Sequence, residues 1–260
     1  MPVTRRVVRP TAPAIKRRMR AAAEKLGVPI PAGYADKRPW YGKPARALAA
    51  LLAKQYGLKS GQLITVELLR RISVTLGDAA TPGAAAYRWL DENRAYEDWR
   101  NNRSALIDAW WKEYDADFVG QPWCGLAVWK AYKDGAGVDL RDAGVVYTPG
   151  LTASIYAKHV VTDKSGKRFA LGVVSPFAAR PGDIVLFDWS SAGFGASSTF
   201  ADHVGLVRAA ARNGVLPTLE GNTQPGSSGD QSGHGGGDGV YERERDLRYV
   251  LTVATLIPLN

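Results

Sequence analysis

The stretch Gln121-Pro122-Trp123-Cys124-Gly125-Leu126-Ala127 decides how this chain is interpreted, because it holds the single cysteine among 260 residues. The Pro-Trp pair indicates a tight turn, and residues 124–133 are typical of a helix that begins at the cysteine. A lone thiol forms no intramolecular disulfide and no cysteine-based zinc cage. At a helix N-terminus, unpaired backbone N–H groups and the positive end of the dipole favour a thiolate. Cys124 is therefore either a packing residue or a nucleophile.

The composition is that of a globular protein with one good core, or one core and a small module. Hydrophobic residues make up 45% and charged residues 23% of the chain, which is ordinary for that class. No apolar run approaches the roughly 20 residues that cross a bilayer. The basic N-terminus is not followed by the apolar stretch of a signal peptide. We therefore expect synthesis in the cytoplasm, with another agent responsible for any release.

The net charge of +9 is concentrated in the N-terminal part. Residues 1–60 hold 14 Lys or Arg and two acids, which gives +12, whereas residues 61–260 hold 20 basic and 23 acidic residues, which gives −3. A basic segment of this kind is attracted to a polyanion, such as nucleic acid, anionic lipid or an anionic cell-wall polymer. A solvated, partly disordered tail is an equally good interpretation of residues 1–20.

The pattern of helix and turn signals divides the chain into three parts. We expect a basic, partly disordered or helical arm over 1–35, a small helical module over 36–80 and one larger domain over 81–260. Apolar spacing and terminal glycines predict helices over 14–26, 45–56 and 65–76.

For the larger domain, the sequence predicts helices followed by strands. We predict a long Trp-rich helical stretch over 84–114, then the Cys124 helix. Short β-rich runs follow at 173–174, 183–189, 203–209, 215–220 and 249–257. Gly- and Ser-rich segments at 190–201 and 221–239 are predicted to be exposed, mobile loops. Helices first and strands later indicate an α+β fold, with an antiparallel sheet packed against helices.

A reactive thiol needs a base within hydrogen-bond reach and a third group that orients the base. The chain has three histidines. His159 has no polar neighbours in sequence, and His234 lies in a Gly-rich segment that offers no rigid support. His203 stands at the head of the apolar run Val204-Gly205-Leu206-Val207, where a strand would hold it firmly. His203 is therefore the candidate base.

The orienting group is expected on a neighbouring strand. The run that begins at Val215 ends in Glu220, followed by Gly221 and Asn222. Both Glu220 and Asn222 carry groups that can hydrogen-bond an imidazole. The strand register decides whether the Glu220 end lies near His203 or away from it, and the sequence leaves both registers open. An exposed acid at a strand end is the ordinary alternative for Glu220.

Four sequence pieces, in order, resemble the CHAP domain, the cysteine, histidine-dependent amidohydrolase/peptidase. They are Pro122-Trp123-Cys124-Gly125 with its helix, Arg180-Pro181-Gly182-Asp183 with its apolar strand, Ala201-Asp202-His203-Val204-Gly205, and Leu219-Glu220-Gly221-Asn222-Thr223. The resemblance spans about residues 105–257 and does not extend to residues 1–80. NlpC-type hydrolases are the nearest alternative, but they more often place an aspartate before the cysteine and use a second histidine as the third member.

The resemblance implies a papain-like fold, with the nucleophile helix packed on an antiparallel sheet. It implies Cys124 as nucleophile, His203 as general base and then acid, Glu220 as the orienting group and Asn222 as a supporting polar residue. The expected substrate contacts flank these residues and are Trp123, Trp189 and Asp202. The substrate class would be bacterial peptidoglycan.

No cofactor is expected to be required. Some CHAP domains carry a calcium loop ahead of the cysteine, and Asp115 and Asp117 resemble part of it, because an alternating Asp-x-Asp can wrap a hard cation. Leu126 stands where those members carry another acid. We therefore interpret the pair as a solvated acidic loop, and a zinc site is not expected because no His/Cys pair has ligand spacing.

These features predict a peptidoglycan hydrolase of the phage endolysin type, held in the host cytoplasm until release to the wall. The bond would be the N-acetylmuramoyl-L-alanine amide, or an amide of the stem or bridge peptide. The module over 36–80 is similar to helical peptidoglycan-binding modules of wall hydrolases. Alternatives are a virion-associated tail lysin and a non-catalytic wall-binding or tail protein on a CHAP scaffold. A nucleic-acid-binding protein is a further alternative, but no recognised nucleic-acid motif accompanies the basic segment.

Overall fold

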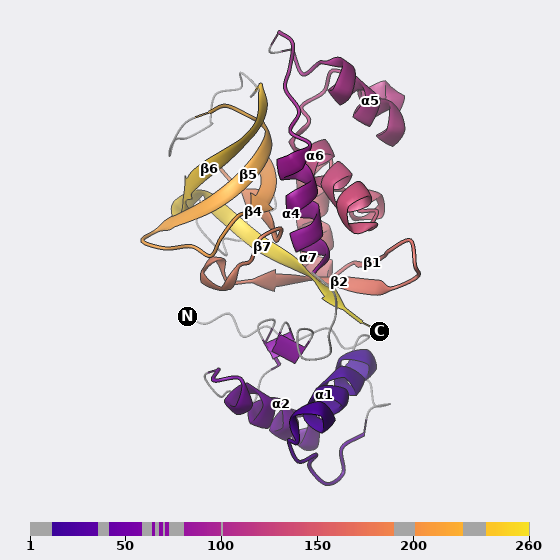
Figure 1. The fold of residues 1–260 in the computed structure, drawn as a ribbon, viewed down its shortest axis with the longest axis vertical. Coiled ribbons are helices and arrows are strands. Elements are labelled where there is room, and N and C mark those ends of the chain that lie inside the picture. The colour runs from indigo at the N-terminus through magenta and orange to yellow at the C-terminus, as the bar shows by residue number, and fades with distance from the viewer. Residues whose placement is uncertain are drawn as a thin grey trace. The chain divides into compact units, whose positions relative to one another are not determined.

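The protein is represented by a computed structural model of all 260 residues. The structure describes residues 12–35, 42–58, 64–65, 68–69, 71–72, 81–99, 101–189, 201–225 and 238–259. The chain forms two compact units (Figure 1). The first comprises Met1–Ala79 together with Lys167–Ala170 and Ile257–Asn260. The second comprises Ala80–Gly166 and Leu171–Leu256.

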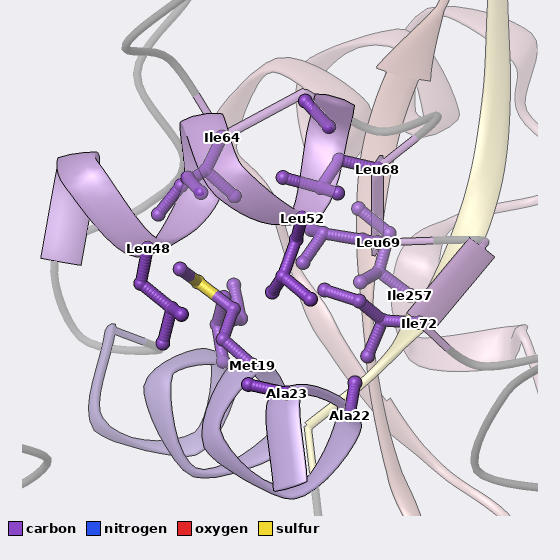
Figure 2. Packing of buried hydrophobic residues seen from close by; sticks show 13 residues of the cluster. Met19, Ala22, Ala23, Leu48, Leu52, Ile64, Leu68, Leu69, Ile72 and Ile257 are labelled. Carbon is purple, nitrogen blue, oxygen red and sulfur yellow. The ribbon is translucent and has the colours of Figure 1, made fainter. Parts of the chain in front are cut away.

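Among the described residues, the first unit contains the helices α1 (Ala12–Leu26) and α2 (Lys43–Gln55). Their apolar residues recur at helical spacing and meet in one core, shown in Figure 2, to which Met19 of α1 and Leu52 of α2 contribute fully buried side chains. The expected boundary at residue 35 separates an arm from a module, whereas in the structure α1 and α2 share this core. Most of the helix predicted over 65–76 lies outside the described residues.

The second unit begins with helices α4 (Pro82–Glu92) and α5 (Ala105–Tyr114), which lie in the long helical stretch predicted over 84–114. The interruption has a local cause. Asn102 adopts a left-handed φ of 61°, and the side chain of Ser104 caps α5 by accepting a hydrogen bond from the Ile107 N–H. Trp99 falls in the interruption and is 85% exposed, so it takes no part in the helix-packed core.

Two more helices follow among the described residues, and the first of them begins at Cys124. Helix α6 (Cys124–Lys130) continues into a π-helical segment over Ala131–Ala136, so the helix predicted over 124–133 is confirmed and extends beyond its expected end. Helix α7 (Thr148–Ala157) was not predicted. Helix α4 packs against the π-helical segment and contacts α6 (Figure 1).

Seven strands form one sheet in the order β1-β2-β7-β3-β4-β5-β6. Their bounds are β1 (Val160–Thr162), β2 (Arg168–Val174), β3 (Ile184–Phe187), β4 (His203–Val207), β5 (Val215–Thr223), β6 (Gly239–Asp246) and β7 (Val250–Pro258). Strand β3 pairs antiparallel with β4, β4 with β5 and β5 with β6, and β3 also pairs antiparallel with β7. The predicted strand runs correspond to β2, β3, β4, β5 and β7, whereas β1 and β6 were not predicted.

Helix α6 lies against β4 and β5, so a helix that starts at the cysteine covers the strands that carry His203 and Glu220. The expected α+β class, with an antiparallel sheet packed against helices, is confirmed. The two predicted loops lie mainly outside the described residues, except that residues 221–223 belong to β5. None of the described helices has the length and apolar character needed to span a bilayer.

Candidate active site

Cys124 is the first residue of α6, and the close packing of this helix fixes its position. All seven residues of α6 are buried. A Cβ atom at Gly125 would lie 2.3 Å from the carbonyl oxygen of Val145, and one at Gly221 of β5 would lie 2.5 Å from the Cβ atom of Ala127. Glycine at both positions therefore lets the helix approach a loop on one side and the sheet on the other.

His203 begins β4 and lies directly opposite Phe187 in the antiparallel register. Its ring is buried against two aromatic neighbours, with ring centroids 5.9 Å from both Phe187 and Trp189. Those two rings stack on each other at 5.2 Å. The imidazole is thus held by packing as well as by hydrogen bonds, which limits its rotation.

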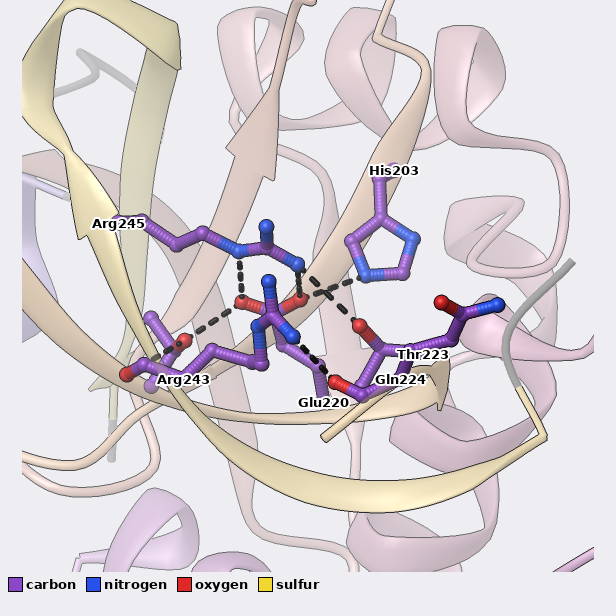
Figure 3. Close-up of polar contacts among 7 residues, drawn as sticks. His203, Glu220, Thr223, Gln224, Arg243 and Arg245 are labelled. Atoms are coloured by element: carbon purple, nitrogen blue, oxygen red, sulfur yellow. Dashed lines mark hydrogen bonds and ion pairs between the residues drawn. The ribbon is translucent and has the colours of Figure 1, made fainter. Parts of the chain in front are cut away.

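The register of β4 and β5 brings Glu220 to His203. Leu206 pairs with Leu219 and Val207 with Thr218, so the two chains run antiparallel and the end of β5 lies beside the start of β4. His203 Nε2 and Glu220 Oε2 are 2.9 Å apart (Figure 3). Of the two strand registers that the sequence left open, the structure has the one that brings Glu220 into contact with His203.

The other ring nitrogen of His203 is available to the Cys124 thiol. Cys124 and His203 lie close enough for each to shift the pKa of the other. Because Nε2 is engaged with Glu220, Nδ1 is the ring nitrogen left for the thiol. Cys124, His203 and Glu220 therefore form a continuous series of thiol, imidazole and carboxylate, which is the arrangement that activates a thiol nucleophile.

The environment favours the charged forms of all three groups. Burial alone raises the pKa of the Cys124 thiol, but the His203 imidazolium and backbone hydrogen bonds from Val204 and Gly125 outweigh it and place this pKa below its ordinary value. Burial lowers the pKa of His203, and the opposing contacts with Cys124 and Glu220 raise it to about 9. Both shifts favour the thiolate–imidazolium pair over the neutral pair.

Glu220 has further buried partners that the sequence interpretation missed. Its side chain is fully buried, and Arg245 of β6 donates to both carboxylate oxygens, with Nε 2.9 Å from Oε1. The Thr218 hydroxyl also donates to Oε1. Burial alone raises the pKa of Glu220, but the ion pair with Arg245 and the contact with His203 dominate and hold it well below its usual range.

Asn222 lies near the end of β5, where the pairing with β6 becomes irregular between Glu220 and Thr223. It has a left-handed φ of 54°, and its side chain is buried. None of the described residues donates a hydrogen bond to its buried Oδ1 atom. Its Oδ1 atom therefore makes no hydrogen bond to the His203 imidazole, a contact that the sequence allowed.

The three expected substrate contacts have different positions. Trp123 is fully buried, and its indole N–H donates to Glu97 Oε1 at 2.8 Å, so the ring is packed inside the protein and presents no surface to a ligand. Trp189 is half-buried beside His203. Asp202 is exposed, and its carboxylate accepts a hydrogen bond from the backbone N–H of Trp189. Trp189 and Asp202 therefore lie beside the site, whereas Trp123 supports it from within.

The Asp115 and Asp117 pair has a local structural role. Asp115 caps the short 3-10 turn Ala116–Phe118 by accepting a hydrogen bond from the Asp117 N–H at 3.1 Å. Calcium takes six to eight oxygen ligands. Within the described ranges no three His, Cys, Asp or Glu side chains gather as a ligand set, so these two residues do not fit a calcium site. His234 lies outside the described residues.

No protein-family model, curated protein or solved structure matches this chain.

Proposed function

We propose that this protein is a cysteine-dependent peptidoglycan hydrolase that cleaves an amide bond, either as an N-acetylmuramoyl-L-alanine amidase or as a stem- or bridge-peptide endopeptidase. The observation that carries the proposal is the buried series of Cys124, His203 and Glu220 at the start of a helix. The order of the four sequence pieces that resemble a CHAP domain supports the substrate class. The α+β arrangement, with α6 on an antiparallel sheet, agrees with that resemblance.

The proposed chemistry is acyl transfer in two steps. The Cys124 thiolate attacks the amide carbonyl carbon, and a tetrahedral oxyanion forms. His203 gives its proton to the amine nitrogen as the C–N bond breaks, which leaves a thioester on Sγ and neutral imidazole. The imidazole then takes a proton from water as the water oxygen attacks the thioester, and the acid product leaves.

The first turn of α6 supplies the remaining electrostatic element of this mechanism. Backbone N–H groups in a first helical turn have no acceptor within the helix, so they can donate to an oxyanion. A donor of this kind contributes about 2.7–4 kcal/mol to transition-state stabilisation in comparable acyl transfer. Glu220 keeps the imidazole oriented and stabilises its protonated form.

The test is loss of turbidity of purified bacterial cell walls on addition of the full chain. Cys124→Ala and His203→Ala are each expected to lower the rate by at least about a thousandfold, as removal of members of such triads does. Glu244→Gln is the control, because Glu244 is exposed on β6. Equal lysis by the wild type and Cys124→Ala would overturn the proposal.

Mass spectrometry of the released fragments separates the two kinds of bond. An amidase frees the lactyl end of the sugar and the amine of L-alanine, whereas an endopeptidase leaves the sugar–peptide link intact and creates a new amine within the peptide. We propose further that the protein acts as a phage lysin of the endolysin type, held in the host cytoplasm before release. A virion-associated tail lysin would show the same chemistry, and detection of the protein in purified virions would favour it.

A further inference from the structure

We propose that Arg245 is a positioning residue that fixes the Glu220 carboxylate and, through it, sets the protonation state of the Cys124–His203 pair. The sequence interpretation assigned no role to Arg245. This inference deepens the proposed function, because it concerns the same site, but its contacts exist whether or not peptidoglycan is the substrate.

The geometry leaves Glu220 little freedom to rotate. Arg245 Nε donates to Oε1 at 2.9 Å and Nη2 donates to Oε2, so the planar guanidinium meets the carboxylate in a two-pronged contact (Figure 3). Such bidentate pairs define the orientation of both partners. Nη2 also reaches the hydroxyl of Thr223 at 3.3 Å. The oxygen that faces His203 Nε2 is therefore held in place by a second residue.

The surroundings of Arg245 fix the guanidinium in turn. The side chain is 1% exposed, and its guanidinium carbon lies 5.0 Å from the ring centre of Trp189 and 5.6 Å from that of Phe187. These are the same two aromatic rings that flank His203. One pair of aromatic side chains thus packs against the base and against the residue that orients its carboxylate partner.

Because the Arg245–Glu220 ion pair is buried, a contribution to fold stability alone explains it poorly. Moving two charges out of water costs several kcal/mol per ion, and a buried ion pair often stabilises a fold no better than apolar residues of equal volume. A lysine would supply charge but not the planar fork. An arginine at this position is therefore better explained by the orientation and charge that it gives to Glu220.

The charges of the site balance only when Arg245 is counted. Glu220 is faced by Arg245 from β6, His203 from β4 and the neutral Thr218 on its own strand, with Arg243 of β6 acting at longer range. In the active state Arg245 and His203 are positive, and Glu220 and Cys124 are negative. Removal of Arg245 leaves these four positions with a net negative charge in a buried site, and uptake of a proton relieves it.

The experiment measures the rate of Cys124 alkylation by iodoacetamide between pH 4 and pH 10, in which the thiolate displaces iodide. It uses the full chain and needs no cell wall. For Arg245→Met we expect the midpoint to move to higher pH by about one unit, so that alkylation on the acid side is about tenfold slower. Arg245→Lys keeps the charge but loses the fork, so we expect a smaller shift in the same direction, about threefold.

Arg243→Met is the matched control. Arg243 lies two positions earlier on β6 and is also buried, but it donates to the carbonyl oxygen of Gln224 and not to Glu220. We expect the midpoint of its alkylation profile to move less than that of Arg245→Lys. A folded Arg245→Met protein whose profile coincides with that of the wild type would overturn the inference.

Two further outcomes have defined meanings. If Arg245→Met does not give the circular dichroism of the folded protein, Arg245→Lys decides: a shifted midpoint supports the inference, and an unshifted one overturns it. If the Arg245→Met profile is shifted but the wild type leaves cell walls intact, the role of Arg245 is supported and the proposed function is contradicted. If the wild type hydrolyses walls but the Arg245→Met profile is unshifted, the proposed function is supported and the role of Arg245 is contradicted.

Discussion

At the scale of single residues, the site depends on charges that are stable in the interior only as a group. Cys124 is 9% exposed, His203 is 7% exposed, and Glu220 is fully buried. An isolated charge at any of these positions would be neutralised by a shift of its pKa. Each group keeps its charge because the next one in the series has the opposite sign.

The pH dependence of wall hydrolysis follows from these opposite shifts. The thiolate forms below the ordinary pKa of a cysteine, and the proton that His203 gives to the leaving amine is lost as the pH rises through about 9. We expect the rate to stay high across neutral pH and to fall above about pH 9. The measurement is the initial rate of turbidity loss at constant ionic strength. A rate that is still constant at pH 10.5 would contradict this assignment.

Glu220→Gln is predicted to destabilise the fold at neutral pH by about 3–5 kcal/mol, because it leaves the buried charge of Arg245 without its partner. The folded-state pKa of Glu220 is depressed, so its stabilisation is present above the unfolded value of 4.5 and is lost as the pH falls through the folded pKa.

Urea unfolding of the wild type and Glu220→Gln at pH 7 and at pH 3 measures this effect. The difference in free energy of unfolding should shrink at the lower pH. Glu244→Gln on the exposed face of β6 should change the stability by no more than about 0.5 kcal/mol. A difference between the wild type and Glu220→Gln that grows on acidification would show that Glu220 is not ionised in the folded protein.

The sequence was enough to select Cys124 and His203 as candidate site residues, but it did not point to Arg245. Cys124 is unique, and His203 stands at the head of an apolar strand, so both were identifiable. Arg245 lies in Tyr241-Glu242-Arg243-Glu244-Arg245, where alternating charges resemble a solvated face. Its role depends on burial against Trp189, which only the fold reveals. Trp123 was expected to contact substrate because it is next to Cys124 in sequence, but neighbouring side chains can point in different directions, and its ring is buried.

At the scale of elements, the contact between α6 and β5 sets the distance from the nucleophile to the base. Gly221→Ala would place a methyl group 2.5 Å from the Cβ atom of Ala127 and 2.9 Å from the Trp123 ring, closer than such atoms pack. We expect the helix to be displaced from the strand, with a loss of about 1–3 kcal/mol of stability.

The catalytic consequence of Gly221→Ala should exceed its effect on stability. We expect wall hydrolysis to fall by about a hundredfold in protein that remains folded, because a displacement of about 1 Å between reacting groups costs that much. Turbidity loss and urea unfolding measured on the same sample give the comparison. Unchanged hydrolysis would show that α6 and β5 can separate without moving Cys124 from His203.

Element boundaries were less predictable than element types, for local reasons. The sequence indicated a long helical stretch over 84–114, but the left-handed Asn102 and the Ser104 cap divide it into two helices. Strand β6 follows a Gly-rich segment and contains acids and arginines, which are poor signals for a strand. The register of β4 and β5 could not be predicted, because both strands are buried on both faces and show no alternation.

At the scale of the whole molecule, the basic charge and the candidate site belong to different units. The first unit has its own apolar core and presents exposed cationic residues, among them Arg17 of α1 and Lys54 of α2. A polyanionic partner such as an anionic wall polymer would be attracted mainly to this unit. The reactive thiol belongs to the other unit, so binding and catalysis can be tested separately.

Reversal of both charges, Arg17→Glu with Lys54→Glu, is predicted to weaken sedimentation of the protein with purified walls about tenfold at low ionic strength. The difference should vanish near 1 M salt, where charges are screened beyond about 3 Å. Lys112→Glu with Lys164→Glu is the control, because it makes the same change of net charge on exposed residues of the second unit. Equal weakening by both pairs would contradict a special role for the first unit, and Cys124 alkylation should be unchanged in both.

The core of the first unit includes Ile257, which joins residues from α1 and α2 although it lies near the other end of the chain (Figure 2). This affects the order in which the protein can fold during its synthesis on the ribosome. At about 5–20 residues per second, Ile257 is added on the order of ten seconds or more after Ile72. Until then the N-terminal helices lack part of their apolar covering, so the segment that is made first must be among the last to complete its folding.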